Sequence, residues 1–384
     1  MIPKTHQYIL EIEKTLDLRL IVYFLGDRPL ATTQIADDAI RPMYEHLKEI
    51  GKCNRLGLFL YGVGGVMETP WKIVTMLREF CDELVVIVPY KAYSAATMIC
   101  LGADKILMTP KGELSPIDPI LQFIGPERPS QLLMPEIGVE DISSYVKFLK
   151  ERAGLTDQSA LSEGINALAQ ILTPPFLGRI ERVYSHIRLV ARKLLSLCRP
   201  PLDERKITTI VESLTEKTYA HGHGIGRKEA KEIGLPVEYL DEEKEKDVWE
   251  LYKKYEEWLK LRSISDPRAY FTDTESDTYT EKEIPFACIE SSKLLHTFIG
   301  DFQLQRIRKI PPQPVINVNL NVSLPPNILP AQIPQQVHLI LQQLLQQASQ
   351  QIQQMVAQEI ARQSPVERIE GGIVGGDWKL VQRY

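Results

Sequence analysis

The amino-acid sequence predicts an α/β protein whose core is a parallel β-sheet built from βαβ units, with a helical insertion and a C-terminal helical tail. Two observations predict this class. In the first 110 residues, short apolar runs of strand length alternate with helical patterns. From about 126 to 215, and again from 335 to 363, amphipathic helical patterns dominate. Strands that alternate with helices favour a parallel sheet covered by helices on both faces.

Local signals place each element of the core in order. Gly51 is typical of a helix end, while Thr69 can cap the next helix and Pro70 suits its first turn. The expected elements are a strand at 18–25, a helix at 35–50, a strand at 55–62, a helix from Thr69, a strand at 84–89, a helix from Ser94 to Leu101, a strand in ADKILMTP (103–110) and a helix within 224–237 closed by Gly234.

Changes in composition along the chain divide it into six segments. They are the first part of the core (1–125), a helical insertion (126–204), the last part of the core (205–240), a charged helix with a connecting segment (241–310), a Pro- and Asn-rich linker (311–334) and a Gln-rich helix with a tail (335–384). In the last segment, apolar residues recur at helical spacing on a glutamine background. This stripe predicts self-association.

Composition excludes several classes of protein. The 384 residues are 44% hydrophobic and 25% charged, with a net charge of −5, which is typical of a soluble globular protein and gives no nucleic-acid footprint. The apolar runs are shorter than a membrane span, and acidic residues interrupt the N-terminal pattern, so no signal peptide is expected. Five scattered cysteines without a C-x-x-C pair predict reduced thiols in a cytoplasmic protein with no metal or other cofactor.

A lone serine, Ser94, stands among small residues in KAYSAATMICLGADKILMTP, at the head of an expected helix. One interpretation is that Ser94 caps a helix whose small residues pack closely against the sheet. The other is that Ser94 is a nucleophile. The surrounding motifs must distinguish the two.

Adjacent glycines, Gly64 and Gly65, follow the expected strand at 55–62 and precede a helix. Glycines permit backbone geometry that points N–H groups outward. Together with the amide of Ala95, the residue after Ser94, they could form an oxyanion hole. An ordinary strand-to-helix turn remains the alternative. A nucleotide-binding loop is not expected, because the lysine and hydroxyl of the P-loop motif are missing.

The combined order of GVGG (62–65), AYSAAT (92–97), GADKILMTPKGELSPIDPIL (102–121) and HGHGIGRKEAKEIGLPV (221–237) resembles the Clp protease and signal peptide peptidase A superfamily. Within it, the chain looks most similar to the Clp-fold serine proteinases of the serine dehydrogenase proteinase type. The resemblance covers roughly residues 15–125 and 205–240. It implies a Clp/crotonase-like core, a nucleophilic Ser94 and a homo-oligomer.

The same resemblance implies a base for the serine. In Clp proteases a histidine follows the serine at the place where this chain has Asp118, and the aspartate lies where this chain has His221 and His223. Acid and base are therefore expected to have exchanged places, with His221 as base and Asp118 as the group that orients it. Triads tolerate such reordering, because geometry defines them and chain order does not.

Alternatives to this triad remain open. His223 could be the base in place of His221, or Lys111 could form a Ser-Lys dyad with Ser94, as in signal peptide peptidases. A lysine base must be desolvated to lose its proton near neutral pH. The HGH motif could also be a solvated turn, and it falls short of a full set of metal ligands. Asp118, between two prolines, could be a turn residue.

The predicted function is peptide-bond hydrolysis through a Ser94 acyl-enzyme, with a peptide or protein as substrate. The alternatives are a catalytically silent Clp-fold scaffold, which would act through protein contacts of the insertion and tail, and a crotonase-like acyl-CoA enzyme, since that fold shares the oxyanion loop. A serine-reactive probe, tail-dependent assembly and thioester turnover would distinguish the three.

Overall fold

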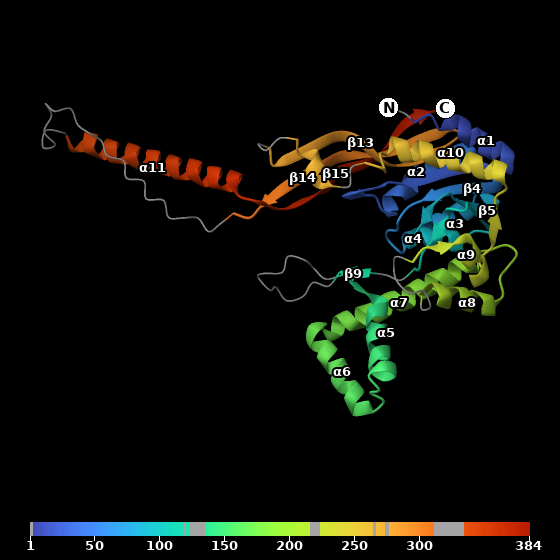
Figure 1. Ribbon diagram of the computed structural model, residues 1–384. Helices are drawn as coiled ribbons and strands as arrows, with labels where there is room; N and C mark the ends of the chain where they lie inside the picture. The colour runs from blue at the N-terminus through green and yellow to red at the C-terminus, as the bar shows by residue number, and fades with distance from the viewer. Residues whose placement is uncertain are drawn as a thin grey trace. The chain divides into compact units, whose positions relative to one another are not determined.

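The computed structural model describes residues 3–117, 120–122, 136–215, 223–263, 266–272, 276–310 and 334–384 (Figure 1). These residues form two compact units. The first comprises 1–263, 283–300 and 375–384, and the second comprises 264–282 and 301–374. The predicted linker, the predicted strand in VINVNLNV and the candidate site residues Asp118 and His221 lie outside the described residues.

The first unit is built on a sheet with the strand order β12-β7-β5-β4-β1-β13-β14-β15. Its first five strands are parallel and alternate with helices in the sequence, which confirms the predicted α/β class. They and the connecting helices are β1 (Arg19–Leu25), α2 (Ile40–Ile50), β4 (Cys53–Tyr61), α3 (Thr69–Arg78), β5 (Cys81–Val88), α4 (Ala95–Leu101), β7 (Lys105–Met108), α8 (Glu204–Thr215), α9 (Arg227–Ile233) and β12 (Val237–Tyr239).

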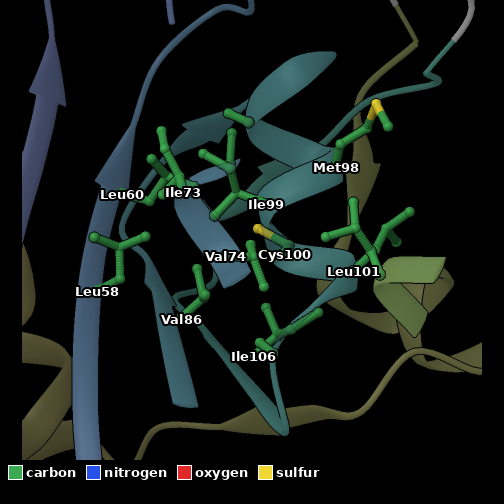
Figure 2. Close-up of a cluster of buried hydrophobic side chains, with 14 of the residues drawn as sticks. Leu58, Leu60, Ile73, Val74, Val86, Met98, Ile99, Cys100, Leu101 and Ile106 are labelled. Atoms are coloured by element: carbon green, nitrogen blue, oxygen red, sulfur yellow. The ribbon is translucent and has the colours of Figure 1, made fainter. Parts of the chain in front are cut away.

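Both faces of the parallel strands are buried. Along β1, Ile21, Tyr23 and Leu25 pack into the cluster that includes α2, α3 and α4, whereas the alternate residues pack into a second cluster with α1 (His6–Leu16) and α10 (Glu242–Trp258). This two-sided burial explains the continuous apolar runs in the sequence. Figure 2 shows part of the first cluster, with Leu58, Leu60, Ile73, Val74, Val86, Met98, Ile99, Cys100, Leu101 and Ile106 labelled. Each fully buried side chain of this size contributes roughly 1.5–3 kcal/mol.

The predicted helical insertion is observed as helices that follow a short β-ribbon. The ribbon pairs β9 (Ile120–Gln122) with β10 (Glu136–Gly138), and the helical segments are α5 (Val139–Lys147), a π-helical turn η2 (Phe148–Arg152), α6 (Gln158–Ile171) and α7 (Pro174–Leu195). The end of α7 belongs to the core, because Ile187, Ala191 and Leu194 pack in the same cluster as α3 and α4. The insertion is therefore fixed to the sheet through its last helix.

The main difference from the sequence prediction is a pair of long strands in the segment 241–310, where only a charged helix and a connection were expected. After α10 and a short η3 (Pro267–Tyr270), the chain forms β13 (Thr278–Ser291) and β14 (Leu294–Arg308). β13 adds antiparallel to β1, with Tyr23 opposite Ile289. The segment mixes charged residues and a proline with apolar ones, so its strand pattern is weak. Pairing with a distant, strongly apolar strand decides its structure.

The second unit contains the remaining parts of β13, β14 and the last strand, together with the tail helix. The helix α11 (Gln335–Gln363) has the predicted bounds, and β15 (Val366–Arg383), which the sequence analysis did not predict, follows it. Within this unit, Tyr270 and Tyr279 pack their rings on the buried Phe302, with centroids 5.6 and 6.4 Å away. No residue of α11 whose side chain is described is buried.

Three short elements complete the first unit near the candidate site. They are the hairpin of β2 (Asp27–Arg28) and β3 (Ala31–Thr32), a 3-10 turn η1 (Asp37–Ala39), and a small sheet of β11 (Ile225–Gly226), β8 (Glu113–Leu114) and β6 (Lys91–Ala92). The small sheet joins the segment before Ser94 to the segment after His223. Within the described ranges, none of the helices combines the length and apolar character that crossing a bilayer requires.

A buried chain of hydrogen bonds connects α2 to the β13–β14 turn. His46 Nδ1 lies 2.8 Å from Ser291 Oγ, His46 Nε2 lies 3.1 Å from His296 Nδ1, and His296 Nε2 lies 3.2 Å from Glu45 Oε2. If His296 Nε2–H donates to the Glu45 carboxylate, the neutral chain has one direction, from the Ser291 hydroxyl through both imidazoles. Each ring nitrogen is then used, so an added proton on His46 has no acceptor.

This chain predicts that acid destabilises the fold. Burial lowers the pKa of His46 to about 3, and the neighbouring His296 adds to that shift. The unfolded chain, with an ordinary histidine pKa near 6.5, then binds more protons than the folded chain between pH 6.5 and 3. Stability is therefore present above pH 6.5 and lost as the pH falls. From pH 7.5 to 5, we expect His46 to remove about 2 kcal/mol of unfolding free energy, measured by urea denaturation.

The charged groups near this chain are Glu45 and Arg383, which act on His296, and Glu49, which pairs with Arg383. Carboxylates elsewhere also titrate, so the control is the same pH series on His46→Gln. We expect a smaller loss between pH 7.5 and 5 in that variant. An identical loss in both proteins would show that His46 is not its source.

Candidate active site

Ser94 lies at the turn between β6 and α4, in a backbone conformation that is unusual for serine. Its φ is 51° and its ψ is −113°, and the next seven residues form α4, in which every side chain is buried. Non-glycine residues at positive φ are strained, and such strain persists only where the surroundings impose it. The same kind of strained serine between strand and helix exposes the nucleophile of other hydrolases. The structure therefore favours a functional interpretation over a simple helix cap.

The glycine loop lies against this serine. A Cβ atom built on Gly64 would be 3.0 Å from Ser94 Cβ and 3.4 Å from Ser94 Oγ. A Cβ atom on Gly65 would lie 2.2 Å from the Ile35 carbonyl oxygen and 2.4 Å from its nitrogen. Both glycines also have positive φ, at 123° and 152°. Only glycine fits at Gly65, and a side chain at Gly64 would crowd the serine.

Backbone hydrogen bonds fix this loop from one side. Ile35 N–H donates to the Gly64 carbonyl at 2.9 Å, and Val66 N–H donates to the Ile35 carbonyl at 2.8 Å. This bridge does not use the amide of Gly65, which lies between them in the chain. The amide of Ala95 is in the first turn of α4, where N–H groups have no acceptor within the helix. These two amides are candidates for oxyanion donors.

The hydroxyl of Ser94 is half-buried, and Met67 Sδ lies 3.5 Å from Ser94 Oγ. Thioether sulfur is a weak acceptor. The sequence analysis did not predict Met67 at the site, since a methionine shortly after the glycines gives no chemical signal. In the described part of the chain, no titratable side chain is recorded in hydrogen-bond contact with this hydroxyl.

The predicted base and orienting acid, His221 and Asp118, lie outside the described residues, but their described neighbours are held in the same region. Ile117 N–H donates to the Leu214 carbonyl at 3.1 Å, which joins the segment before Asp118 to the end of α8. β11 pairs with β8, which in turn pairs with β6, the strand that leads to Ser94. The chain on either side of both candidates is thus anchored close to the serine turn.

The alternative bases have other partners or full solvent contact. His223 Nε2 lies 3.2 Å from Glu229 Oε1 on α9. Lys111 is exposed in the turn between β7 and β8, so water stabilises its charged form. Lys91, three residues before Ser94, pairs with Asp27 at 2.8 Å, which also keeps a lysine charged. These contacts favour a histidine from the HGH segment over either lysine as the base.

Two further pairs of polar residues near Ser94 were not predicted from the sequence. Tyr93 donates to Glu113 at 2.5 Å, and burial together with this carboxylate raises the pKa of the Tyr93 phenol. Ser115 accepts a hydrogen bond from the Ser94 amide at 2.7 Å and donates one to the Pro116 carbonyl. In the ranges that the structure describes, no group of three or more His, Cys, Asp or Glu side chains is placed to hold a metal ion.

The chain has distant relatives among curated proteins. It is 27% identical over 201 residues to the uncharacterized protein MJ0137 of Methanocaldococcus jannaschii, covering 52% of this chain and 59% of that protein. It is 21% identical over 198 residues to the uncharacterized protein MJ1495 of the same organism, covering 51% and 56%. The matches thus span less than three fifths of the length of these relatives. No protein-family model matches the chain.

Solved structures with a similar fold are proteases. The 1510-N membrane-bound stomatin-specific protease, in a serine-to-alanine mutant form, is 18% identical with a TM-score of 0.36, over 62% of this chain and 84% of that one. The ClpP protease catalytic domain from Plasmodium falciparum is 11% identical with a TM-score of 0.32, over 63% and 93%. ClpP1 from Listeria monocytogenes is 13% identical with a TM-score of 0.32, over 60% and 97%.

Proposed function

We propose that this protein is a serine peptidase of the Clp-fold serine proteinase type, with Ser94 as its nucleophile. The observation that carries the proposal is the strained backbone of Ser94, at φ 51° and ψ −113°, directly against the Gly64–Gly65 loop. A serine hydroxyl held at the start of a helix, with backbone amides beside it, suits attack on a carbonyl carbon. A structural cap would not need positive φ.

The amides of Gly65 and Ala95 are the proposed oxyanion donors. Both belong to backbone that is held in place before substrate binds, by the Ile35 bridge and by α4. Preorganised donors of this kind stabilise the negative charge of the tetrahedral intermediate without reorganising in the reaction. The contact of Gly64 with Ser94 brings the two donors to the same side of the hydroxyl.

In the proposed reaction, Ser94 Oγ attacks a peptide carbonyl while His221 accepts its proton, and Asp118 orients the imidazole. The carbonyl oxygen takes the negative charge. His221 then gives the proton to the leaving amine, and an acyl-enzyme remains. Water attacks the acyl-enzyme in the same way and releases the carboxylic acid and Ser94. These steps need no cofactor or metal. An extended peptide bound beside the glycine loop by strand addition would present its carbonyl to Ser94.

The proposal is tested by labelling with a fluorophosphonate probe, which reacts with activated serines. We expect the wild type to be labelled on the peptide that contains Ser94, as located by mass spectrometry, and Ser94→Ala to remain unlabelled. Equal labelling of both proteins would exclude Ser94 as the nucleophile. An unlabelled wild type with tail-dependent assembly would indicate the silent scaffold, and acyl-CoA thioester turnover without Ser94 would indicate the crotonase-like enzyme.

We further propose that the chain forms a homo-oligomer through α11. Ile340, Leu344 and Met355 are more than half exposed along this helix. From 335 to 358 the sequence contains no Asp, Glu, Lys or Arg. Identical copies would therefore meet without charge repulsion, and glutamine amides can both donate and accept between them. A helix of this length in water is marginal without packing, so its apolar stripe needs a partner.

Deletion of the tail is not a clean test of this association. β15 belongs to the sheet, and the C-terminal Tyr384 donates to the buried Glu290 at 2.6 Å. The better variant carries Ile340→Gln, Leu344→Gln and Met355→Gln. We expect a smaller mass by light scattering and unchanged Ser94 labelling. Gln342→Ala with Gln346→Ala, on the opposite side of the helix, is the control. An unchanged mass in the triple variant would refute association through α11.

A further inference from the structure

A buried pair of hydroxyls ties the nucleophile turn to the loop after β8. Ser115, which is 2% exposed, accepts a hydrogen bond from the Ser94 amide at 2.7 Å. Its own amide donates to Thr97 Oγ1 at 3.0 Å, and Thr97 donates to the Ala92 carbonyl at 2.7 Å. The two residues thus bond to the backbone before Ser94, to Ser94 itself and to each other. Neither takes part in the proposed proton transfers.

The hydroxyl of Ser115 is held in one orientation. It donates to the Pro116 carbonyl at 2.8 Å, so its lone pairs remain for the Ser94 amide. Thr97 is fully buried and its hydroxyl donates to Ala92, which leaves it as an acceptor for the Ser115 amide. Every donor in this group therefore has one acceptor. Such a satisfied buried network is rigid, and a missing member leaves a buried polar group without a partner.

We propose that Ser115 is a positioning residue, which keeps Ser94 in its strained conformation and its hydroxyl at the oxyanion donors. This inference rests on the proposed peptidase function. At φ 51° the Ser94 backbone tends to relax, and the hydrogen bond to Ser115 opposes that relaxation. Without the Ser115 hydroxyl, the Ser94 turn can relax and move Oγ away from the attack position. A displacement of about 1 Å lowers a reaction rate by roughly 100-fold.

Ser115→Ala is the variant that tests this role. We expect its second-order rate of fluorophosphonate labelling, and its kcat for fluorogenic peptides, to fall by roughly 100-fold. KM should stay near the wild-type value, because Ser115 does not touch the peptide. Ser115→Thr keeps the hydroxyl and should recover most of the rate. If Ser115→Thr melts at the wild-type temperature but labels no faster than Ser115→Ala, the hydroxyl does not position Ser94 and the inference is wrong.

Thr109→Ala is the matched control for loss of a buried hydroxyl. Thr109 also donates to a carbonyl, that of Pro89 at 2.7 Å, and accepts from an amide, that of Lys111 at 3.1 Å, but it does not contact Ser94. We expect both alanine variants to lower the melting temperature, whereas only Ser115→Ala loses labelling. Equal losses of labelling in the two variants would reduce Ser115 to a general stability role and overturn the inference.

Hydrogen exchange of the Ser94 amide separates this inference from the peptidase proposal. We expect Ser115→Ala to speed exchange at Ser94 and Thr109→Ala to leave it unchanged. Unchanged exchange in Ser115→Ala would overturn the inference even if the wild type reacts with the probe. A wild type that is not labelled would overturn the proposed function, and the positioning role with it. Wild-type labelling together with an equally reactive Ser115→Ala would overturn the positioning role alone.

Discussion

Replacing His221 with alanine is expected to lower kcat for peptide hydrolysis by roughly 10⁴- to 10⁶-fold, because the hydroxyl of Ser94 would lose its proton acceptor. Serine and histidine of a triad act as one unit, so loss of either costs almost the whole catalytic gain of that unit. The measurement is turnover of a fluorogenic peptide library, with the rate of fluorophosphonate labelling as a readout that does not depend on peptide specificity.

The matched control is His223→Ala, two residues away in the same HGH motif. The contact between His223 and Glu229 already uses one of its ring nitrogens, so we expect this variant to keep much of its activity. Lys111→Ala tests the dyad. Exposure of Lys111 predicts an active variant. An inactive Lys111→Ala beside a normal His221→Ala would replace the histidine mechanism with a serine–lysine dyad.

Gly65→Ala is expected to reduce the labelling rate by roughly 10²- to 10³-fold, which is the usual cost of losing one oxyanion donor. The added Cβ would lie 2.2 Å from the Ile35 carbonyl oxygen, a backbone atom that no side-chain rotation can move away. The φ of 152° also disfavours alanine. The loop must therefore shift, which breaks the bridge to Ile35 and turns the Gly65 amide away from Ser94.

Gly51→Ala is a suitable control for this variant. Gly51 also has a positive φ, 75°, but a Cβ there would meet nothing within 4 Å. It should therefore show the cost of backbone strain at a glycine without any clash, about 1 kcal/mol of stability, and label at the wild-type rate. If Gly65→Ala keeps full labelling although it is folded, the glycine loop does not supply an oxyanion donor.

The local patterns of the sequence determined the class of the protein. The apolar runs at 18–25 and 84–89 predict strands buried on both faces, and the structure buries alternate residues of β1 in two separate clusters. The start of α4 after Ser94 and the bounds of α11 also follow from helix signals within a few turns. Such features depend on neighbours that are close in the chain, so periodicity and capping residues reveal them.

Only the tertiary structure decided the features that depend on distant residues. The pairing of β1 with β13 joins residues more than 260 positions apart, although β13 has a weak strand pattern of its own. The strained φ of Ser94, the approach of Gly64 to its hydroxyl and the bond from Ser115 to its amide are likewise long-range contacts. Local propensity carries no information about them, because packing and hydrogen bonding in the folded chain supply the energy that holds these groups in place.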